Sequence, residues 1–122
     1  VEIKAAGDIT TSTIASYVVN QGKGSSGNIS ITSTGGSIDT TKGATQNEGK
    51  GSLDARSESG NGGNITLNAT GDITTLNINS FSVTNGSGGD VSFTTSGGNI
   101  TTGGIDASSK DSQGIGNGGN IA

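Results

Sequence analysis

The sequence predicts an all-β fold, a parallel β-solenoid of about four triangular coils with three short strands in each coil. Three observations lead to this prediction. One short phrase of Gly, Asn or Asp and a β-branched residue recurs along the chain, glycine supplies 24 of the 122 residues, and hydrophobic residues make up only 26%. Typical domains contain roughly 45–50% apolar residues. A stack of coils around a core one side chain thick would need far fewer.

The first strand of each coil is predicted at a recurring Gly-Asn-Ile phrase. Copies occupy residues 27–31, 63–67, 89–93 and 119–121, and residues 1–3 repeat the phrase without its first two positions. Alternating β-branched stretches bounded by Gly are typical of strands. We therefore place the coils at 1–28, 29–64, 65–90 and 91–120 (coils 1 to 4), with a fifth beginning at 121–122. The whole of 1–122 is then one solenoid segment of a longer repetitive chain.

Two further strands follow in each coil. A Gly-x-Ile-x-Thr phrase recurs at residues 7–11, 36–40, 71–75 and 98–102. The third strand is predicted at an apolar residue, which is Ile14, Leu53, Ile78 or Ile105. This residue comes five positions after the second-phrase Ile in three coils and fifteen after it in coil 2. The extra residues, 42–50, are predicted to project as a loop because the pattern resumes unaltered after them.

Equivalent strands are expected to stack in parallel, about 4.8 Å apart, so that equivalent residues form columns. The predicted inward columns are Val1, Ile29, Ile65, Val91 and Ile121; Ile3, Ile31, Leu67 and Phe93; Ile9, Ile38, Ile73 and Ile100; and Ile14, Leu53, Ile78 and Ile105. Asn28, Asn64, Asp90 and Asn120 fall at one corner, where their side chains should form a hydrogen-bonded ladder between coils. Coils 1 and 3 share one sequence type and coils 2 and 4 another, which indicates a repeating unit of two coils.

Composition argues against several classes of function. The chain has no Cys or His, which removes disulfides, Cys-based metal sites and the commonest general base. A net charge of −4 argues against nucleic acid as a partner, and no apolar run is long enough to cross a membrane. We assign no catalytic residue, metal ligand or cofactor, and we do not expect an enzyme.

Carboxylates are the only catalytic candidates. Asp8 and Asp72 occupy equivalent positions two coils apart, as do Asp54 and Asp106, so each pair should lie roughly 10 Å apart. Glycoside hydrolysis needs two carboxyl groups about 5–9.5 Å apart on either side of one bond. We favour turn-capping roles for these residues. A calcium site or an ice-binding Thr array is less favoured, because neither the Asp positions nor the outward Thr positions repeat regularly.

Four apolar residues near the end of the third strand stand out: Tyr17, Val19, Phe81 and Val83. Counting by twos from the inward isoleucines places them on the outside of the coil. We favour a bulge that turns them inward. The alternative is an exposed apolar stripe that serves as a lateral interface with a partner.

The phrases GGNITLNATGDITT (62–75) and GGNITTGGIDASS (97–109), with the spacer SGNGGN (59–64), resemble the shaft repeats of filamentous-haemagglutinin-like exoproteins. Those proteins are large two-partner-secreted adhesins of Gram-negative bacteria, and this Gly/Asn/Thr-rich variety is similar to the cyanobacterial type. The resemblance covers essentially the whole chain. It implies a right-handed β-helix at the cell surface or outside the cell.

We therefore expect a structural shaft segment of a secreted bacterial surface fibre or adhesin. Neither end has a capping helix or a charged edge strand, so we expect the stack either to continue covalently or to add copies of itself head to tail. Val1, Ile3, Ile105 and Ile121 would lie on the stacking faces, and a surface polysaccharide is a possible further partner. The alternative is a carbohydrate-active or carbohydrate-binding β-helix domain.

Overall fold

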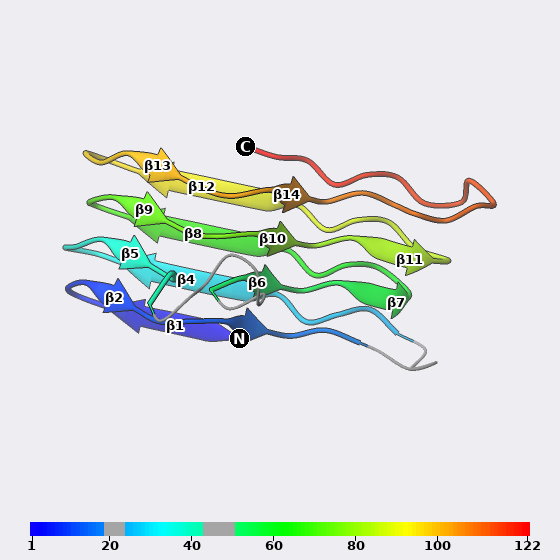
Figure 1. Cartoon of the computed structure of the whole chain (residues 1–122), viewed down its shortest axis with the longest axis horizontal. Helices are drawn as coiled ribbons and strands as arrows, with labels where there is room; N and C mark the ends of the chain where they lie inside the picture. The colour runs from blue at the N-terminus through cyan, green and yellow to red at the C-terminus, as the bar shows by residue number, and fades with distance from the viewer. Residues whose placement is uncertain (19–23, 43–50) are drawn as a thin grey trace.

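The computed structural model describes residues 1–18, 24–42 and 51–122, and these form an all-β solenoid of parallel strands (Figure 1). Strands from successive coils lie one above the other, from the N-terminus at one side of the stack to the C-terminus at the other. The strand pairs of the described residues are all parallel, and three of the sheets contain four strands each. The described part of the chain contains no helix that could cross a membrane.

The sheet with the longest strands has one strand from each coil in the order β1-β4-β8-β12. Its strands are β1 (Glu2–Ala5), β4 (Ile29–Ser33), β8 (Ile65–Ala69) and β12 (Val91–Thr95). Ile31 pairs with Ile3 on one side and with Leu67 on the other, as the repeated phrase predicts. Ile121 bridges to Val91, so the phrase at 119–121 also takes its predicted place.

Two sheets of two-residue strands complete the predicted pattern. One has the order β13-β9-β5-β2 and the other β14-β10-β6-β3. The first contains β2 (Ile9–Thr10), β5 (Ile38–Asp39), β9 (Ile73–Thr74) and β13 (Ile100–Thr101). The second contains β3 (Ile14–Ala15), β6 (Leu53–Asp54), β10 (Ile78–Asn79) and β14 (Ile105–Asp106). The strand registers pair the apolar residues of the second phrase, and those of the third strand, in the predicted columns.

The core is a set of aliphatic columns whose residues are buried in the middle of the stack and become exposed at its last coil. Ile38 and Ile73 are 1% and 0% exposed, whereas Ile100, in the same column, is 45% exposed. Burial of the whole column, as predicted, is therefore wrong for Ile100, because no described coil covers it. Thr40 and Thr75 follow the column inward and are almost completely buried.

Each coil extends beyond the three predicted strands, and this extension was not predicted. β7 (Ser57–Ser59) and β11 (Ser82–Thr84) form a fourth, two-stranded sheet that projects past β6 and β10 (Figure 1). Isolated bridges extend the same pairing to Val18 in coil 1 and to Ser109 in coil 4. We call this part of the coils the tongue.

Glycine and serine make the tongue thin. The hydroxyl groups of Ser57, Ser82 and Ser109 donate to the carbonyl oxygens of Gly24, Gly60 and Gly86, at 2.8, 2.7 and 2.9 Å. Each serine thus reaches a glycine of the preceding coil. A Cβ atom on Gly86 would overlap the carbonyl group of Gly60, so a larger residue does not fit in this column.

The predicted loop 42–50 lies, apart from Lys42, outside the residues that the structure describes. The frame on either side of it is closed by polar contacts. Thr40 Oγ1 donates to the carbonyl oxygen of Gly51 at 3.1 Å, and the Gly51 amide donates to Thr13 Oγ1 at 2.8 Å. The coil is therefore held together at the point where the extra residues leave and return.

Candidate functional site

The aromatic residues singled out in the sequence face outward, on the surface that carries β6, β10 and the tongue. Tyr17 is 46% exposed, and Phe81 is half-buried between the buried residues Ser80 and Ser82. The favoured prediction of an inward bulge is therefore wrong for both aromatic residues. The serines take the inward positions because the glycine column leaves no room for a ring. Val83 is half-buried, and Val19 lies outside the described residues.

A cation from the next coil lies over each ring, and the lateral interface remains a prediction. The guanidinium carbon of Arg56 is 5.1 Å from the centre of the Tyr17 ring. Nζ of Lys110 is 3.5 Å from the centre of the Phe81 ring. A cation over a ring face is attracted by the negative charge of the π system. Coils 1 and 3 thus supply the rings, and coils 2 and 4 supply the cations.

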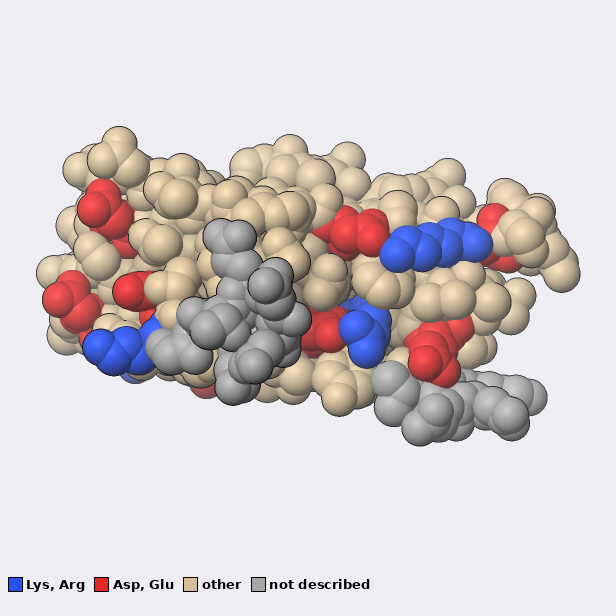
Figure 2. Space-filling model, in the orientation of Figure 1, with Lys and Arg blue, Asp and Glu red and all other residues tan. Residues whose placement is uncertain are grey.

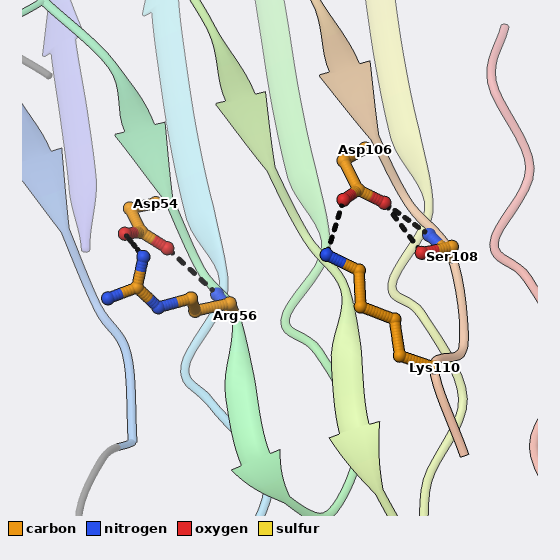
Figure 3. Close-up of polar contacts among 5 residues, drawn as sticks. All are labelled: Asp54, Arg56, Asp106, Ser108 and Lys110. Carbon is orange, nitrogen blue, oxygen red and sulfur yellow. Dashed lines mark hydrogen bonds and ion pairs between the residues drawn. The ribbon is translucent and has the colours of Figure 1, made fainter. Parts of the chain in front are cut away.

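Each cation also pairs with a carboxylate of its own coil (Figure 3). Arg56 Nη1 lies 3.0 Å from Asp54 Oδ2, and Lys110 Nζ lies 2.8 Å from Asp106 Oδ2. Asp54 and Asp106 both pair with Asn79 of β10, from opposite sides. The two carboxylates therefore lie two coils apart, roughly 10 Å.

Hydrogen bonds to Asp106 favour its ionised form. Burial raises the pKa of the Asp106 carboxyl, but the hydrogen bonds from Lys110 and Ser108 outweigh burial and hold the pKa below its ordinary value. Ser108 donates twice to Oδ1, from its backbone amide at 3.1 Å and from its hydroxyl at 2.6 Å. Such a carboxylate holds a turn in place and is poorly suited to donate a proton near neutral pH.

Together these residues form a charged ledge, which we define as Tyr17, Asp54, Arg56, Phe81, Asp106 and Lys110. Figure 2 shows acidic and basic atoms side by side on this face, over the tongue and the strands next to it. The ledge consists of the same aromatic–cation–carboxylate set repeated after two coils. In the described ranges no three acidic side chains come close enough to hold a metal ion.

The second pair of candidate carboxylates belongs to a corner of the coil. Asp8 Oδ1 accepts a hydrogen bond from the Ser37 amide, and Asp72 Oδ1 accepts one from the Asn99 amide, each at 2.8 Å. Between them, Ser37 Oγ accepts from the Asp72 amide at 3.0 Å. Asp8 and Asp72 therefore bond to the next coil and do not cap their own turns. The predicted local capping is found at Asp54, whose Oδ1 accepts from the Arg56 amide at 3.2 Å, and at Asp106.

The predicted ladder at the Gly-Asn corner is also confirmed. Asn28 Oδ1 accepts from the Asn64 amide, Asn64 Oδ1 from the Asp90 amide, and Asp90 Oδ1 from the Asn120 amide, at 2.8, 2.9 and 2.8 Å. A third ladder, not predicted, runs through Ser25, Asn61, Ser87 and Asn117. In all three ladders the backbone amide of the later coil donates to a side-chain oxygen of the earlier coil.

The proposed stacking residues lie in the outermost described coils. Val1 and Ile121 are 53% and 57% exposed, whereas Ile3 and Ile105 are half-buried against the core. They are apolar residues of the stacking columns, as the repeat predicts.

Sequence reasoning missed the pairing of each ring with a cation. The shared Asp54 and Asp106 phrase was visible, but Arg56 follows its Asp by two residues and Lys110 by four, so the cations did not align. The rings and cations also come from different coils, and only the three-dimensional stack brings them together. Comparison of the chain with models of protein families, with curated proteins and with solved structures finds no match.

Proposed function

We propose that this chain is a structural shaft segment of a secreted bacterial surface fibre or adhesin, continuing covalently into further coils or stacking end to end on copies of itself. The observation that carries the proposal is the use of the polar side chains. At three corners, Asn, Asp and Ser side chains accept hydrogen bonds from the next coil. Inside the tongue, Ser hydroxyl groups bind the preceding coil.

The charged ledge supports the same proposal. Arg56 and Lys110 each contact a carboxylate of their own coil and an aromatic ring of the coil before. These contacts join coil 1 to coil 2 and coil 3 to coil 4. Because Asp54 and Asp106 each pair with a neighbouring cation and lie roughly 10 Å apart, they form a poor acid–base pair for hydrolysis.

The resemblance of residues 59–75 and 97–109 to exoprotein shaft repeats supports the location outside the cell and the role in a fibre. A stack of coils gains stability from each added interface, and a rod of any length can be built from one repeated unit. The shaft would hold a binding region at a distance from the cell. A surface polysaccharide would then be a partner of the fibre.

A tandem protein tests covalent continuation. Because Ile121 and Val1 have the same position in the repeat, two copies of residues 1–120 joined directly should continue the stack in register. We expect one unfolding transition at a higher temperature than for the single segment, because Ile100 of the first copy becomes covered. Ile100→Asp in the first copy is the matched control and should remove the gain. Two independent transitions at the single-segment temperature would contradict the shaft proposal.

Assembly between separate chains is tested by sedimentation velocity and electron microscopy of the purified segment over a range of concentrations. End-to-end stacking predicts rods whose length increases with concentration, since a head-to-tail contact does not close. A segment that stays monomeric at the highest concentration would exclude this form of assembly.

A further inference from the structure

We infer that Asn85, at the tip of the tongue, is a site of spontaneous deamidation. We also infer that the hydrogen-bond ladder protects Asn61 against the same reaction. Asn is followed by Gly at three described positions: Asn61-Gly62, Asn85-Gly86 and Asn117-Gly118. Glycine has no side chain to hinder its amide nitrogen, and the chain around it turns easily. The sequence alone treats the three pairs as equal, but the structure does not.

The reaction needs a free side-chain amide and a free glycine nitrogen. The Gly nitrogen attacks Cγ of the Asn side chain, a C–N bond forms, and ammonia leaves with the former amide nitrogen. The resulting five-membered succinimide then takes up solvent water and opens to aspartate or isoaspartate. No oxidant, metal or enzyme is required.

At Asn61 both reacting groups are held by coil 3. The side-chain oxygen of Asn61 accepts from the Ser87 amide at 2.9 Å, and the Gly62 amide donates to the Ser87 carbonyl oxygen at 2.9 Å. Both hydrogen bonds must open before the nitrogen can reach Cγ. The ladder therefore protects Asn61 against deamidation.

At Asn85 neither reacting group, the Asn85 side chain or the Gly86 amide, has a hydrogen-bond partner among the described residues, although Gly86 itself is buried in the glycine column. Asn85 is exposed, and it is the only described residue other than glycine with a positive φ, 56°. It directly follows β11, in an exposed bend of the tongue.

Asn117 is an internal comparison between these extremes. Its amide donates to Ser87 Oγ at 3.1 Å, and its carbonyl oxygen accepts from the Gly88 amide at 2.9 Å, so its backbone is held. No hydrogen bond holds its side chain among the described residues. We therefore expect the rates in the folded chain to fall in the order Asn85, Asn117, Asn61.

The product would matter to the tongue. Isoaspartate adds one carbon atom to the backbone immediately before Gly86, whose carbonyl oxygen accepts from Ser109 Oγ at 2.9 Å and whose Cα packs against Gly60. The longer backbone cannot keep Gly86 in its column. Conversion to isoaspartate should loosen the contact between the tongues of coils 3 and 4, whereas conversion to aspartate only adds a negative charge.

The test is to incubate the full chain at mildly alkaline pH and to follow each Asn-Gly pair by peptide mass spectrometry, with isoaspartyl methyltransferase as the probe for isoaspartate. We expect Asn85 to react about tenfold faster than Asn61, since opening two hydrogen bonds must precede reaction at Asn61. In the same chain unfolded in urea, the three pairs should react at similar rates. The variant Asn85→Gly, which suits a positive φ, should lose the modification and keep the fold.

Two results would overturn the inference. In the folded chain, Asn61 could react as fast as Asn85, which would mean that the ladder gives no protection. Alternatively, Asn85 could stay intact when folded while it reacts in urea, which would mean that the tongue itself prevents the reaction. Neither result bears on the shaft proposal, because the tandem protein tests the stacking of coils and the deamidation rates test a single turn.

Discussion

The ammonium nitrogen of Lys110 in coil 4 lies 3.5 Å from the centre of the Phe81 ring in coil 3. The same nitrogen lies 2.8 Å from Asp106 Oδ2. One side chain therefore joins two coils through a ring and secures a turn of its own coil through a carboxylate. Arg56 does the same with Tyr17 and Asp54, so the two-coil unit seen in the sequence is also a unit of contacts.

The contact between Lys110 and Phe81 should be measurable in a double-mutant cycle. We expect Lys110→Met to lower the free energy of unfolding by about 1 kcal/mol, as a cation–π contact and a surface ion pair are each worth roughly 0.5–1 kcal/mol or less. In the background of Phe81→Leu the effect should be about half as large. Urea unfolding of the four proteins gives the coupling energy. Additive effects would show that the ring and the cation do not interact.

The Asn ladder should contribute through its side-chain oxygens. Asn64→Ala removes the acceptor of the Asp90 amide, and we expect a loss of about 0.5–1.5 kcal/mol because water can partly replace it at this exposed corner. Asn64→Asp keeps the oxygen and should be close to neutral, since Asp90 fills the same role one coil later. Equal losses for both variants would argue against the ladder as the cause.

The core column should be most sensitive in the middle of the stack. Ile73 is 0% exposed and pairs with Ile38 and Ile100. We expect Ile73→Ala to cost about 2–5 kcal/mol, as for other fully buried isoleucines. Ile100→Ala is the matched control in the same column, and its cost should be less than half as large because Ile100 is 45% exposed. Equal costs would indicate that another chain covers Ile100 in solution.

Deletion of the insertion 42–50 should have little effect on stability. The deletion leaves three residues (Thr41, Gly51 and Ser52) between Thr40 and Leu53. This length is similar to that of the equivalent connection in coil 3, where two residues lie between Thr75 and Ile78. The cost of closing a loop changes only slowly with its length. We expect a melting temperature within a few degrees of the parent, while Ile38→Ala should lower it clearly. Unfolding of the deletion variant would contradict the assignment of these residues as a loop on an intact frame.

Stability should fall in acid partly through Asp39 and Asp106. The Thr41 hydroxyl and amide, which donate to Asp39, hold the pKa of that carboxyl below its ordinary value. Burial raises the pKa of Asp106, but the hydrogen bonds from Lys110 and Ser108 leave it lowered. A carboxyl whose pKa is lower in the folded state stabilises the fold above its unfolded pKa, and this stabilisation is lost as the pH falls through the folded pKa.

The measurement is the urea midpoint between neutral pH and about pH 3, where free Asp side chains take up protons. Asp106→Asn should make the decrease shallower, and the effect should be small because solvent screens this half-exposed carboxylate. Asp111→Asn, at an exposed turn of the same coil, is the control. An unchanged pH profile for Asp106→Asn would show that the hydrogen bonds to the Asp106 carboxylate do not contribute to the pH dependence of stability.

Periodic features of the coils could be read from the sequence because each coil repeats them. Ile9, Ile38 and Ile73 stand at the same place in equal phrases, so their column followed from alignment alone. The same holds for Asn28, Asn64 and Asp90 at the corner. Parallel stacking converts a repeat in sequence into a contact in space.

The tongue was missed because its inward residues are serines. Ser57 and Ser82 alternate with outward residues as a strand requires, but an inward serine does not give the apolar signal that marks a buried face. Phe81 did give that signal and misled the prediction. The side that a residue faces was decided by the glycine column opposite, which leaves space for a hydroxyl group and not for a ring.

The ladders give the stack a direction. At each of the three corners the backbone amide of the later coil donates to a side-chain oxygen of the earlier coil. The Ser37 amide donates to Asp8 at one corner, and the Asn117 amide donates to Ser87 at another. Any number of such coils is therefore bounded at these corners by unpaired N–H groups on one side and by side-chain oxygens on the other. The two ends of such a rod are therefore chemically different, and a partner that binds one end would not bind the other.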